Sequence, residues 1–445
     1  MARADRPALT PADAHRPPHR ESARRAVEAL WRIESARIVG ALARYTGDLE
    51  LAEDVAQEAV AEALVAWSRD GAPENPVGWL LATARRRAID AFRRRSALDE
   101  RYALLAGRLT EGQAYAGTAA PDSRSDLPWD PDRVDDDVLA LMFVACHPVL
   151  APEARVALTL RAVGGLGSEE IARAFLVPVT TLQARITRAK KTIAAAHVRF
   201  ELPPAEERRE RLGGVLSVLY VIFTEGSTAT SGDRLLRTDL AYEAIRLART
   251  LAALVPDEPE VLGLLALCEL TCARFPARTG PDGEPVLLED QDRRLWDRSA
   301  IRRGLAALGR AATTGRGLGP YGLQAAIAAC HASAPSVQET DWERIVLLYE
   351  ALGRVAPSPV VELNRAVAVA MAHGPQQALS IVDGLAAAGR LTGSHLLPGV
   401  RGELLSRLGR TVEARAEFER AAGLCRNLPE RSVLLRKAAA LDRLG

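Results

Sequence analysis

Hydrophobic residues recur every three or four positions over most of this chain, and apolar and polar residues almost never alternate. That spacing places apolar side chains on one face of a helix, whereas strands favour alternation. The helical spacing runs from residue 23 to 95, from 138 to about 200, and onward to the C-terminus. The pattern therefore predicts an all-α protein, and a length of 445 residues predicts more than one domain.

Polar and helix-breaking stretches divide the chain into five parts. Residues 1–22 are predicted to be a flexible tail, and residues 23–95 a first helical domain. Residues 96–136 are rich in Gly, Pro and Asp, which predicts a linker whose first residues could continue the preceding helix. Residues 137–200 form a second helical domain, and residues 201–445 a long helical region.

The long helical region contains a weak internal repeat. Residues 242–266 align with residues 342–366, with Glu, Ile, Leu, Val, Pro and Ala at matching positions. Gly374 and Gly409 align in a second pair of segments, 35 residues apart. Both offsets are close to multiples of the roughly 34-residue helical-hairpin repeat, which predicts a solenoid of the tetratricopeptide (TPR) type. The alternative is a chance similarity between Ala- and Leu-rich amphipathic helices.

Composition favours a cytoplasmic protein without metal or cofactor. No apolar run approaches the roughly 20 residues of a membrane span, and the N-terminus lacks the apolar core of a signal peptide. The net charge is +1, so any nucleic-acid surface must be local. The five cysteines form no CxxC pair; Cys268 and Cys272, one helical turn apart, and the Cys146-His147 pair are interpreted as ordinary core residues.

Residues 168–186, SEEIARAFLVPVTTLQARI, predict a helix-turn-helix. Ser168 is a candidate N-cap, and Thr180 or Thr181 could cap the second helix. Pro178 ends the first helix. Leu176 stands in the bend, where many such motifs have Gly for a positive φ.

The second helix of this motif presents polar side chains that could reach base edges or phosphates in a major groove. A buried helical hairpin with a basic solvated face would have a similar sequence. The candidate DNA contacts are Thr181, Gln183, Arg185, Arg188, Lys190 and Lys191.

Two further segments with opposite charge occur in residues 23–95. The first, residues 51–64, has a predicted apolar side and a predicted acidic side. The apolar side consists of Leu51, Val55, Ala59 and Leu64, and the acidic side of Glu53, Asp54, Glu58 and Glu62. The second, residues 79–95, begins with Trp and holds two Arg triplets. An acidic helix suits a basic protein partner, and an Arg-rich helix suits phosphate.

The order of LAEDVAQEAVAEAL, WLLATARRRAIDAFRRR and the helix-turn-helix strongly resembles bacterial RNA polymerase sigma factors of the extracytoplasmic-function group, over roughly residues 25–200. The resemblance implies that residues 23–95 are region 2, which binds core polymerase and the minus-10 element. It implies that residues 137–200 are region 4, which binds the minus-35 element. Such a protein is not an enzyme: it binds core polymerase reversibly and directs it to promoters.

The resemblance also assigns roles to residues. It implies polymerase contacts at Asp54, Gln57 and Glu58, and DNA contacts at Trp79, Arg85, Arg86, Arg87, Arg93 and Arg94. Asp90 is interpreted as an internal hydrogen-bonding or salt-bridging residue, and the loop 70–76 lies where the family captures an unstacked promoter base. Arg86 departs from the commonest family pattern, which has Asn, so no base preference follows there.

Residues 201–445 resemble the extension of a sigma-factor subgroup with a C-terminal TPR-like domain, through stretches such as FTEGS and LEDQDRRLWD. The resemblance implies that the extension modulates activity, and a solenoid of this kind could bind a regulatory protein or peptide.

Two other functions compete with the sigma-factor reading. One is a stand-alone helix-turn-helix regulator with a ligand- or protein-sensing helical domain, although it has no need for the acidic helix. The other is an enzyme, with Asp290, Asp292 and Asp297 as an oxygen-ligand site or Glu225 and His331 as an acid/base pair. A scaffold in which arginines 293, 294 and 298 pair with those carboxylates is the favoured interpretation of these residues.

Overall fold

The computed structural model describes residues 19–109, 134–281 and 284–442. Within these residues it contains eighteen α-helices and no β-strand, which confirms the all-α prediction. None of the helices found there is both long and apolar enough to cross a bilayer. The chain divides into an N-terminal unit, residues 1–171 with 180–208, and a C-terminal unit, residues 172–179 with 209–445.

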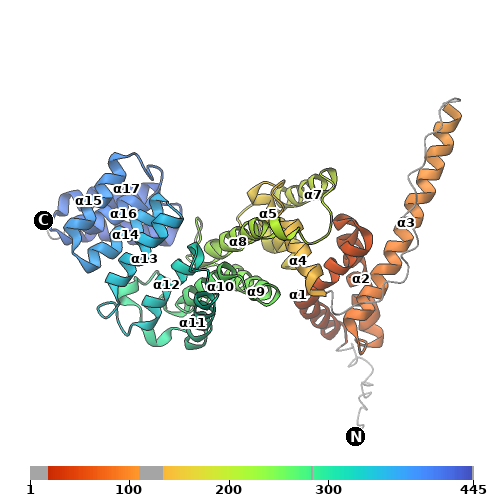
Figure 1. Ribbon diagram of the computed structural model, residues 1–445, viewed down its shortest axis with the longest axis horizontal. Helices are drawn as coiled ribbons and strands as arrows, with labels where there is room; N and C mark the ends of the chain where they lie inside the picture. Colours follow the sequence, from red (N-terminus) through yellow and green to blue (C-terminus); the bar gives the residue numbers. More distant parts are fainter. Residues whose placement is uncertain (1–18, 110–133, 282–283, 443–445) are drawn as a thin grey trace, which may run out of the picture. The chain divides into compact units, whose positions relative to one another are not determined.

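The N-terminal unit consists of two helical groups that contact each other through α1. Helix α1 packs along α2, both contact α3, and α1 also packs on α4 and on a short π-helix (Figure 1). The elements are α1 (His19–Thr46), α2 (Leu49–Asp70), α3 (Pro76–Leu109), α4 (Val134–Ala145), α5 (Pro152–Leu158), the π-helix Thr159–Val163, α6 (Ser168–Ala174) and α7 (Val179–Ala195).

Helix ends differ from the predicted boundaries in two places. Helix α1 begins at His19, inside the predicted tail, and α3 continues to Leu109, well beyond residue 95. The long α3 is therefore helical through the start of the predicted linker. The rest of the predicted tail and linker, residues 1–18 and 110–133, lies outside the described residues.

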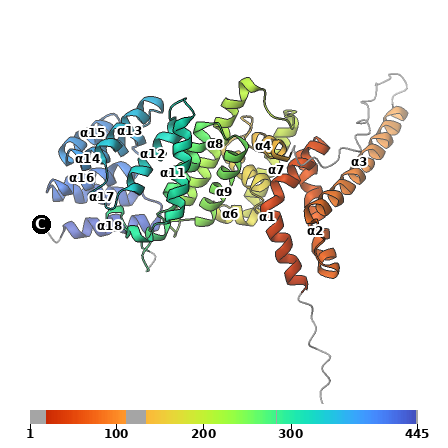
Figure 2. The same ribbon diagram turned by 60° about the horizontal axis from the view of Figure 1, so that its bottom comes forward.

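The C-terminal unit is a succession of helical hairpins in which each helix from α9 to α18 packs on its neighbours along the chain (Figure 2). Three short 3-10 helices, at residues 275–277, 288–290 and 293–295, interrupt the series between α10 and α11. The helices are α8 (Ala205–Ser227), α9 (Thr238–Leu254), α10 (Pro259–Cys272), α11 (Arg298–Thr313), α12 (Pro320–Ser333), α13 (Trp342–Val355), α14 (Pro359–Ala372), α15 (Pro375–Ala387), α16 (Leu396–Arg407), α17 (Thr411–Leu424) and α18 (Leu428–Leu441).

The aligned sequence segments form equivalent hairpins, α9 with α10 and α13 with α14. Pro259 and Pro359 both occupy the first residue of the second helix, where the missing amide hydrogen costs nothing. Gly374 and Gly409 lie between consecutive helices with φ of 97° and 75°, a conformation that L side chains disfavour. The repeat seen in the sequence is therefore a repeat of structure.

The cysteines that were interpreted as core residues lie in the core. Cys268 and Cys272 are buried in α10, and burial raises the pKa of the Cys272 thiol to about 12. Cys146 is also buried, with its Sγ 3.3 Å from Oγ1 of Thr159. Thiols held in the protonated form by burial are poor nucleophiles and poor metal ligands.

Candidate protein-binding and nucleic-acid interface

Helix α2 carries the candidate polymerase contacts on its open face. Asp48 caps the helix by accepting hydrogen bonds from the backbone amides of Glu50 and Leu51, at 2.9 and 3.2 Å. Asp54 and Glu58, one turn apart, are exposed, and Gln57 beside them is half-buried. Carboxylates at i and i+4 share a helix face, so the predicted acidic surface exists around these residues.

The two sides of α2 differ from the prediction at Leu64 and Glu53. Leu64 is 39% exposed, whereas Glu53 is only 4% exposed. Most residues of the buried stripe are small, which allows a close helix approach. The stripe consists of Ala52, Val55, Ala56, Ala59, Ala63 and the larger Trp67. Side-chain size at the contact, rather than hydrophobicity alone, decides which face packs.

Glu53 is buried because two cations lie beside it. Arg161 of the π-helix donates from Nε to Oε1 at 2.6 Å, and Lys190 of α7 lies 2.9 Å from Oε2. A buried carboxylate needs such partners to offset the loss of hydration. Two further ion pairs join the same helical groups, Arg44 with Asp137 at 2.8 Å and Arg32 with Glu170 at 3.3 Å. Within the N-terminal unit, the predicted region 2 and region 4 are thus connected by ion pairs.

Helix α3 exposes most of the predicted DNA contacts. Arg86, Arg93 and Arg94 are exposed, and the guanidinium of Arg85 lies 5.7 Å from the centre of the Tyr45 ring. Trp79 is half-buried and packs edge-on against Trp67, with ring centres 5.6 Å apart. One face of Trp79 is therefore structural, while the arginines are free to contact phosphate.

Arg87 and Asp90 lie in settings that the sequence did not predict. Arg87 donates to Glu62 at 2.9 Å and lies 3.8 Å from Glu58, and the hydrogen bond to Glu62 raises the pKa of Arg87. Arg87 thus connects α3 to the acidic face of α2. Asp90 is exposed rather than internal, and its negative charge contributes to raising the pKa of Arg87.

The loop between α2 and α3 is open to solvent. Gly71 ends α2 with φ of 82°, and the side chain of Asn75 accepts a hydrogen bond from the Gly78 amide at 2.9 Å. Ala72 and Glu74 are exposed. An exposed loop beside Trp79 and basic residues retains the features expected for binding an unstacked base.

The helix-turn-helix is present, and both of its helices start earlier than the predicted caps imply. Helix α6 starts at Ser168 itself, and Glu170 accepts a hydrogen bond from the Gly167 amide at 2.7 Å, so Ser168 is not the N-cap. Helix α7 starts at Val179, which places Thr180 and Thr181 in its first turn rather than at its cap. Leu176 adopts φ of 52°, so a leucine takes the left-handed conformation that Gly has in many such turns.

Helix α7 buries one stripe and exposes most of the predicted DNA contacts. Arg185 is half-buried. Lys190 is the exception among the predicted contacts, because its side chain is 11% exposed and pairs with Glu53. The buried stripe consists of Leu182, Ile186, Ala189 and Ile193, and the exposed contacts are Thr181, Gln183, Arg188 and Lys191.

The bend of the helix-turn-helix belongs to the C-terminal unit, which sequence reasoning missed. Arg237 is buried there and donates a hydrogen bond to the carbonyl of Ala174. The same guanidinium bonds to Glu225 at 2.5 Å and to the Ser231 carbonyl at 2.9 Å. One arginine therefore links the end of α6 to α8 and to the segment before α9.

The candidate enzyme residues have structural partners. Glu225 bonds to Arg237 and to Thr230, whereas the ring of His331 packs on Trp342 with centres 5.2 Å apart. Asp297 caps α11 through the amides of Ser299 and Ala300.

The predicted arginine pairing is only partly right. Arg294 pairs with Asp292 at 2.7 Å, but Arg293 donates instead to the carbonyls of His331 and Ala334.

Burial of His331 predicts a pH-dependent stability. Burial, aided by the charges of Arg274 and Arg293, lowers the pKa of His331 to about 4. The unfolded chain binds this proton near pH 6.5 and the folded chain only near pH 4, so stability is lost as the pH falls between these values.

We expect the wild type to lose up to about 3 kcal/mol more unfolding free energy than His331→Asn between pH 7 and pH 4. Urea titrations at each pH check this result, with His373→Asn as the control that keeps the wild-type slope. Parallel slopes for the wild type and His331→Asn would contradict it.

Three segments of the chain match known protein families. Residues 30–97 match sigma-70 region 2, residues 140–193 match sigma-70 region 4, and residues 211–312 match a family of unknown function, DUF6596. An uncharacterized protein of Rhizobium meliloti is 45% identical over 404 residues, which cover 88% of this chain and 90% of that protein. No solved structure matches the chain.

A second relative is a Mycobacterium tuberculosis protein named "Probable ECF RNA polymerase sigma factor SigI". It is 29% identical over 182 residues, which cover 41% of this chain and 59% of that protein. The two matched regions include α2 with α3 and α6 with α7, and they are the parts with which sigma factors bind core RNA polymerase and promoter DNA. The chain therefore belongs to the sigma-70 family, in its extracytoplasmic-function group, and carries a helical C-terminal extension that begins with the DUF6596 family.

Proposed function

We propose that the chain binds core RNA polymerase through the open acidic face of α2 and recognises promoters through α3 and α7. One observation supports the polymerase contact above all. Asp54 and Glu58 are exposed on α2, whereas Glu53 on the same helix is buried. Partial loss of hydration, opposed by the charge of Lys190 and aided by the neighbouring carboxylates, raises the pKa of Asp54. A basic partner would stabilise the charged form of this carboxylate.

The minus-10 element would meet the exposed arginines of α3, and the minus-35 element the polar face of α7. The two elements are roughly 25 base pairs apart, about 85 Å along B-form DNA. An ion pair of 2.9 Å between Glu53 of α2 and Lys190 of α7 cannot persist while both elements are bound. We infer that the paired arrangement belongs to the free protein and that promoter binding breaks the pairs of Glu53, which releases Lys190 toward DNA.

The C-terminal extension is proposed to control promoter recognition through the bend of the helix-turn-helix. Arg237 supports this proposal, since it bonds to Ala174 at the end of α6 and to two segments of the extension. A helix that recognises bases must be oriented within a fraction of an ångström, and the bend sets that orientation. A regulatory protein or peptide bound to the extension could act by the same route.

Replacing Arg237 tests this control. Arg237→Gln leaves Glu225 buried without its cation and frees the bend, so we expect transcription from a minus-35-dependent promoter to change at least about fivefold. Binding to core polymerase is expected to stay unchanged, because α2 is untouched. The measurement is in vitro transcription together with a core-binding assay, and Arg365→Gln, which breaks an ion pair within α14, is the matched control. Unchanged transcription by a folded Arg237→Gln variant would contradict the proposal.

A further inference from the structure

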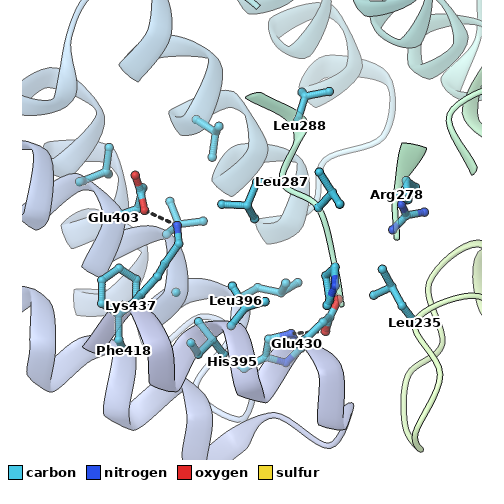
Figure 3. Close-up of a pocket in the computed structure, with 18 of the residues that line it drawn as sticks. Leu235, Arg278, Leu287, Leu288, His395, Leu396, Glu403, Phe418, Glu430 and Lys437 are labelled. Carbon is cyan, nitrogen blue, oxygen red and sulfur yellow. Dashed lines mark hydrogen bonds and ion pairs between the residues drawn. The ribbon is translucent and has the colours of Figure 1, made fainter. Parts of the chain in front are cut away.

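A cavity of about 490 Å³ lies in the C-terminal unit, far along the chain from the polymerase and promoter helices. Its walls are the segment 285–291 and helices α16 and α18 (Figure 3). The lining is mostly apolar and includes Leu287, Leu396, Val400, Leu404, Phe418 and Leu434. Cavities of roughly 300–1,000 Å³ with an apolar lining and a few polar groups are typical of small-molecule sites.

Two arginines in the lining lack a carboxylate partner among the described residues. Arg274 donates from Nε to the side-chain oxygen of Gln291 at 3.3 Å and lies 5.4 Å from the centre of the Trp296 ring. Arg278 donates to the Ser227 carbonyl at 2.5 Å and to Oγ1 of Thr228 at 3.1 Å. A guanidinium has five N–H groups, so both side chains retain donors.

The surroundings of these two arginines disfavour their charged form. Burial, followed by the charges of Arg278 and Arg293, lowers the pKa of Arg274 to about 10. Burial likewise lowers the pKa of Arg278, and the charge of Glu430 acts in the opposite direction. An enclosed cation that forms no ion pair gains more from an anion than an exposed one does.

The other charged side chains of the lining are paired with one another. Lys437 lies 2.7 Å from Glu403, which also accepts from Arg407 at 3.2 Å. His395 lies 3.4 Å from Glu430. Figure 3 shows the Lys437–Glu403 pair and Arg278 on opposite sides of the cavity, with Leu287 and Leu396 between them. The unmatched charge of the cavity is therefore positive and lies at the arginine end.

A metal ion is the competing occupant. His395, Cys425 and Glu430 bring one ligand atom each within 4.8 Å of one another. Burial raises the pKa of the Cys425 thiol, which opposes the thiolate that a metal requires. A divalent cation would also add positive charge near Arg278, whose charge interacts with Glu430. The charges favour an anion.

We propose that this cavity binds an organic anion with an apolar body, whose carboxylate or phosphate head contacts Arg274 and Arg278 while the body packs on the leucines. Such a ligand would connect the segment 285–291 to α16 and α18 and would stabilise their packing. The proposal concerns binding alone and does not depend on the proposed function.

The test is isothermal titration calorimetry on the full chain, with decanoate, decyl phosphate and methyl decanoate as probes. We expect one saturable site for decanoate or decyl phosphate, and the better of the two identifies the head group. The uncharged ester is expected to bind at least about tenfold more weakly, since it cannot pair with a guanidinium. Arg274→Gln should weaken anion binding at least about tenfold, and the exposed control Arg354→Gln should not change it.

Three results would overturn the proposal. Equal affinity for the ester and the acids would mean that the cavity selects only apolar bodies. Equal affinity of Arg274→Gln and wild type for the anions would mean that Arg274 does not contact the ligand. If that variant folds poorly, the comparison of the acids with the ester in the wild type still tests the proposal. Binding of zinc that Cys425→Ala abolishes, with no heat from either anion, would assign a cation site instead.

Discussion

Reversing two charges on α2, with Asp54→Arg and Glu58→Arg together, is expected to weaken binding to core RNA polymerase by at least about a hundredfold. Charge-assisted hydrogen bonds contribute about 1.5–3 kcal/mol each, and 1.4 kcal/mol corresponds to a factor of ten. Reversal also adds repulsion from a basic partner surface, which slows association. Both side chains are exposed, so the substitution removes no core contact.

Fluorescence anisotropy with labelled chain and purified core enzyme measures this affinity. The matched control reverses two exposed glutamates on helices of the extension, Glu343→Arg and Glu419→Arg, and is expected to bind as the wild type does. Equal loss in the two double variants would mean that net charge, and not the face of α2, controls docking. A reversed α2 that still binds tightly would remove α2 from the polymerase interface.

The second large effect is expected at Glu53. Glu53→Gln keeps the shape of the side chain and leaves Arg161 and Lys190 enclosed without their counter-charge. Removing one partner of a buried ion pair typically costs about 3–5 kcal/mol. Urea denaturation of the N-terminal unit should show that loss, whereas Glu62→Gln, at a half-buried site on the same helix, should change the curve little.

The Glu53→Gln variant also distinguishes a loss of global stability from a local separation of α2 and α7. If the ion pairs of Glu53 hold α2 to α7, amide hydrogens of α7 should exchange faster in Glu53→Gln at denaturant concentrations where the unit is still folded. A Glu53→Gln variant with wild-type unfolding free energy and wild-type exchange would contradict the role of Glu53 as the connection between the two regions.

Much of the architecture could be predicted because it depends on short-range spacing. The period of the apolar residues predicts the helices. Helix boundaries can also be recognised from local sequence, at Gly374 and Gly409 and at the prolines that begin helices. The helix-turn-helix was found for the same reason, since its bend and its cap residues lie within nineteen residues of sequence. Leu176 adopts the left-handed conformation in spite of its side chain.

The missed features depend on contacts between distant positions. Glu53 stands directly before the exposed Asp54 in the sequence, and its carboxylate is paired with Arg161, which lies 108 residues away. Leu64 is exposed and Ala63 beside it is buried, because the side of α2 that packs consists mostly of small residues. The bond between Arg237 and Ala174 spans 63 residues and likewise leaves no local trace.

The cavity of the extension shows the same limit. Arg274 and Arg278 are two among many arginines in the sequence, and only the fold shows that they line a mostly apolar cavity while its carboxylates pair with other side chains. Conversely, the acidic stretch near residue 290 looked like a candidate ligand site, yet Asp292 pairs with Arg294 and Asp297 caps a helix. Chemistry-bearing residues acquire or lose a role through their tertiary partners.

In vitro transcription with purified core RNA polymerase and a library of random promoter sequences tests the central claim most directly. The account predicts that transcripts start only when the chain is added, downstream of two shared motifs with a fixed spacing, and that Asp54→Arg with Glu58→Arg abolishes them. A chain that binds one DNA motif in the absence of polymerase, and that leaves start sites on the library unchanged when core enzyme is present, would contradict the account and identify a stand-alone regulator.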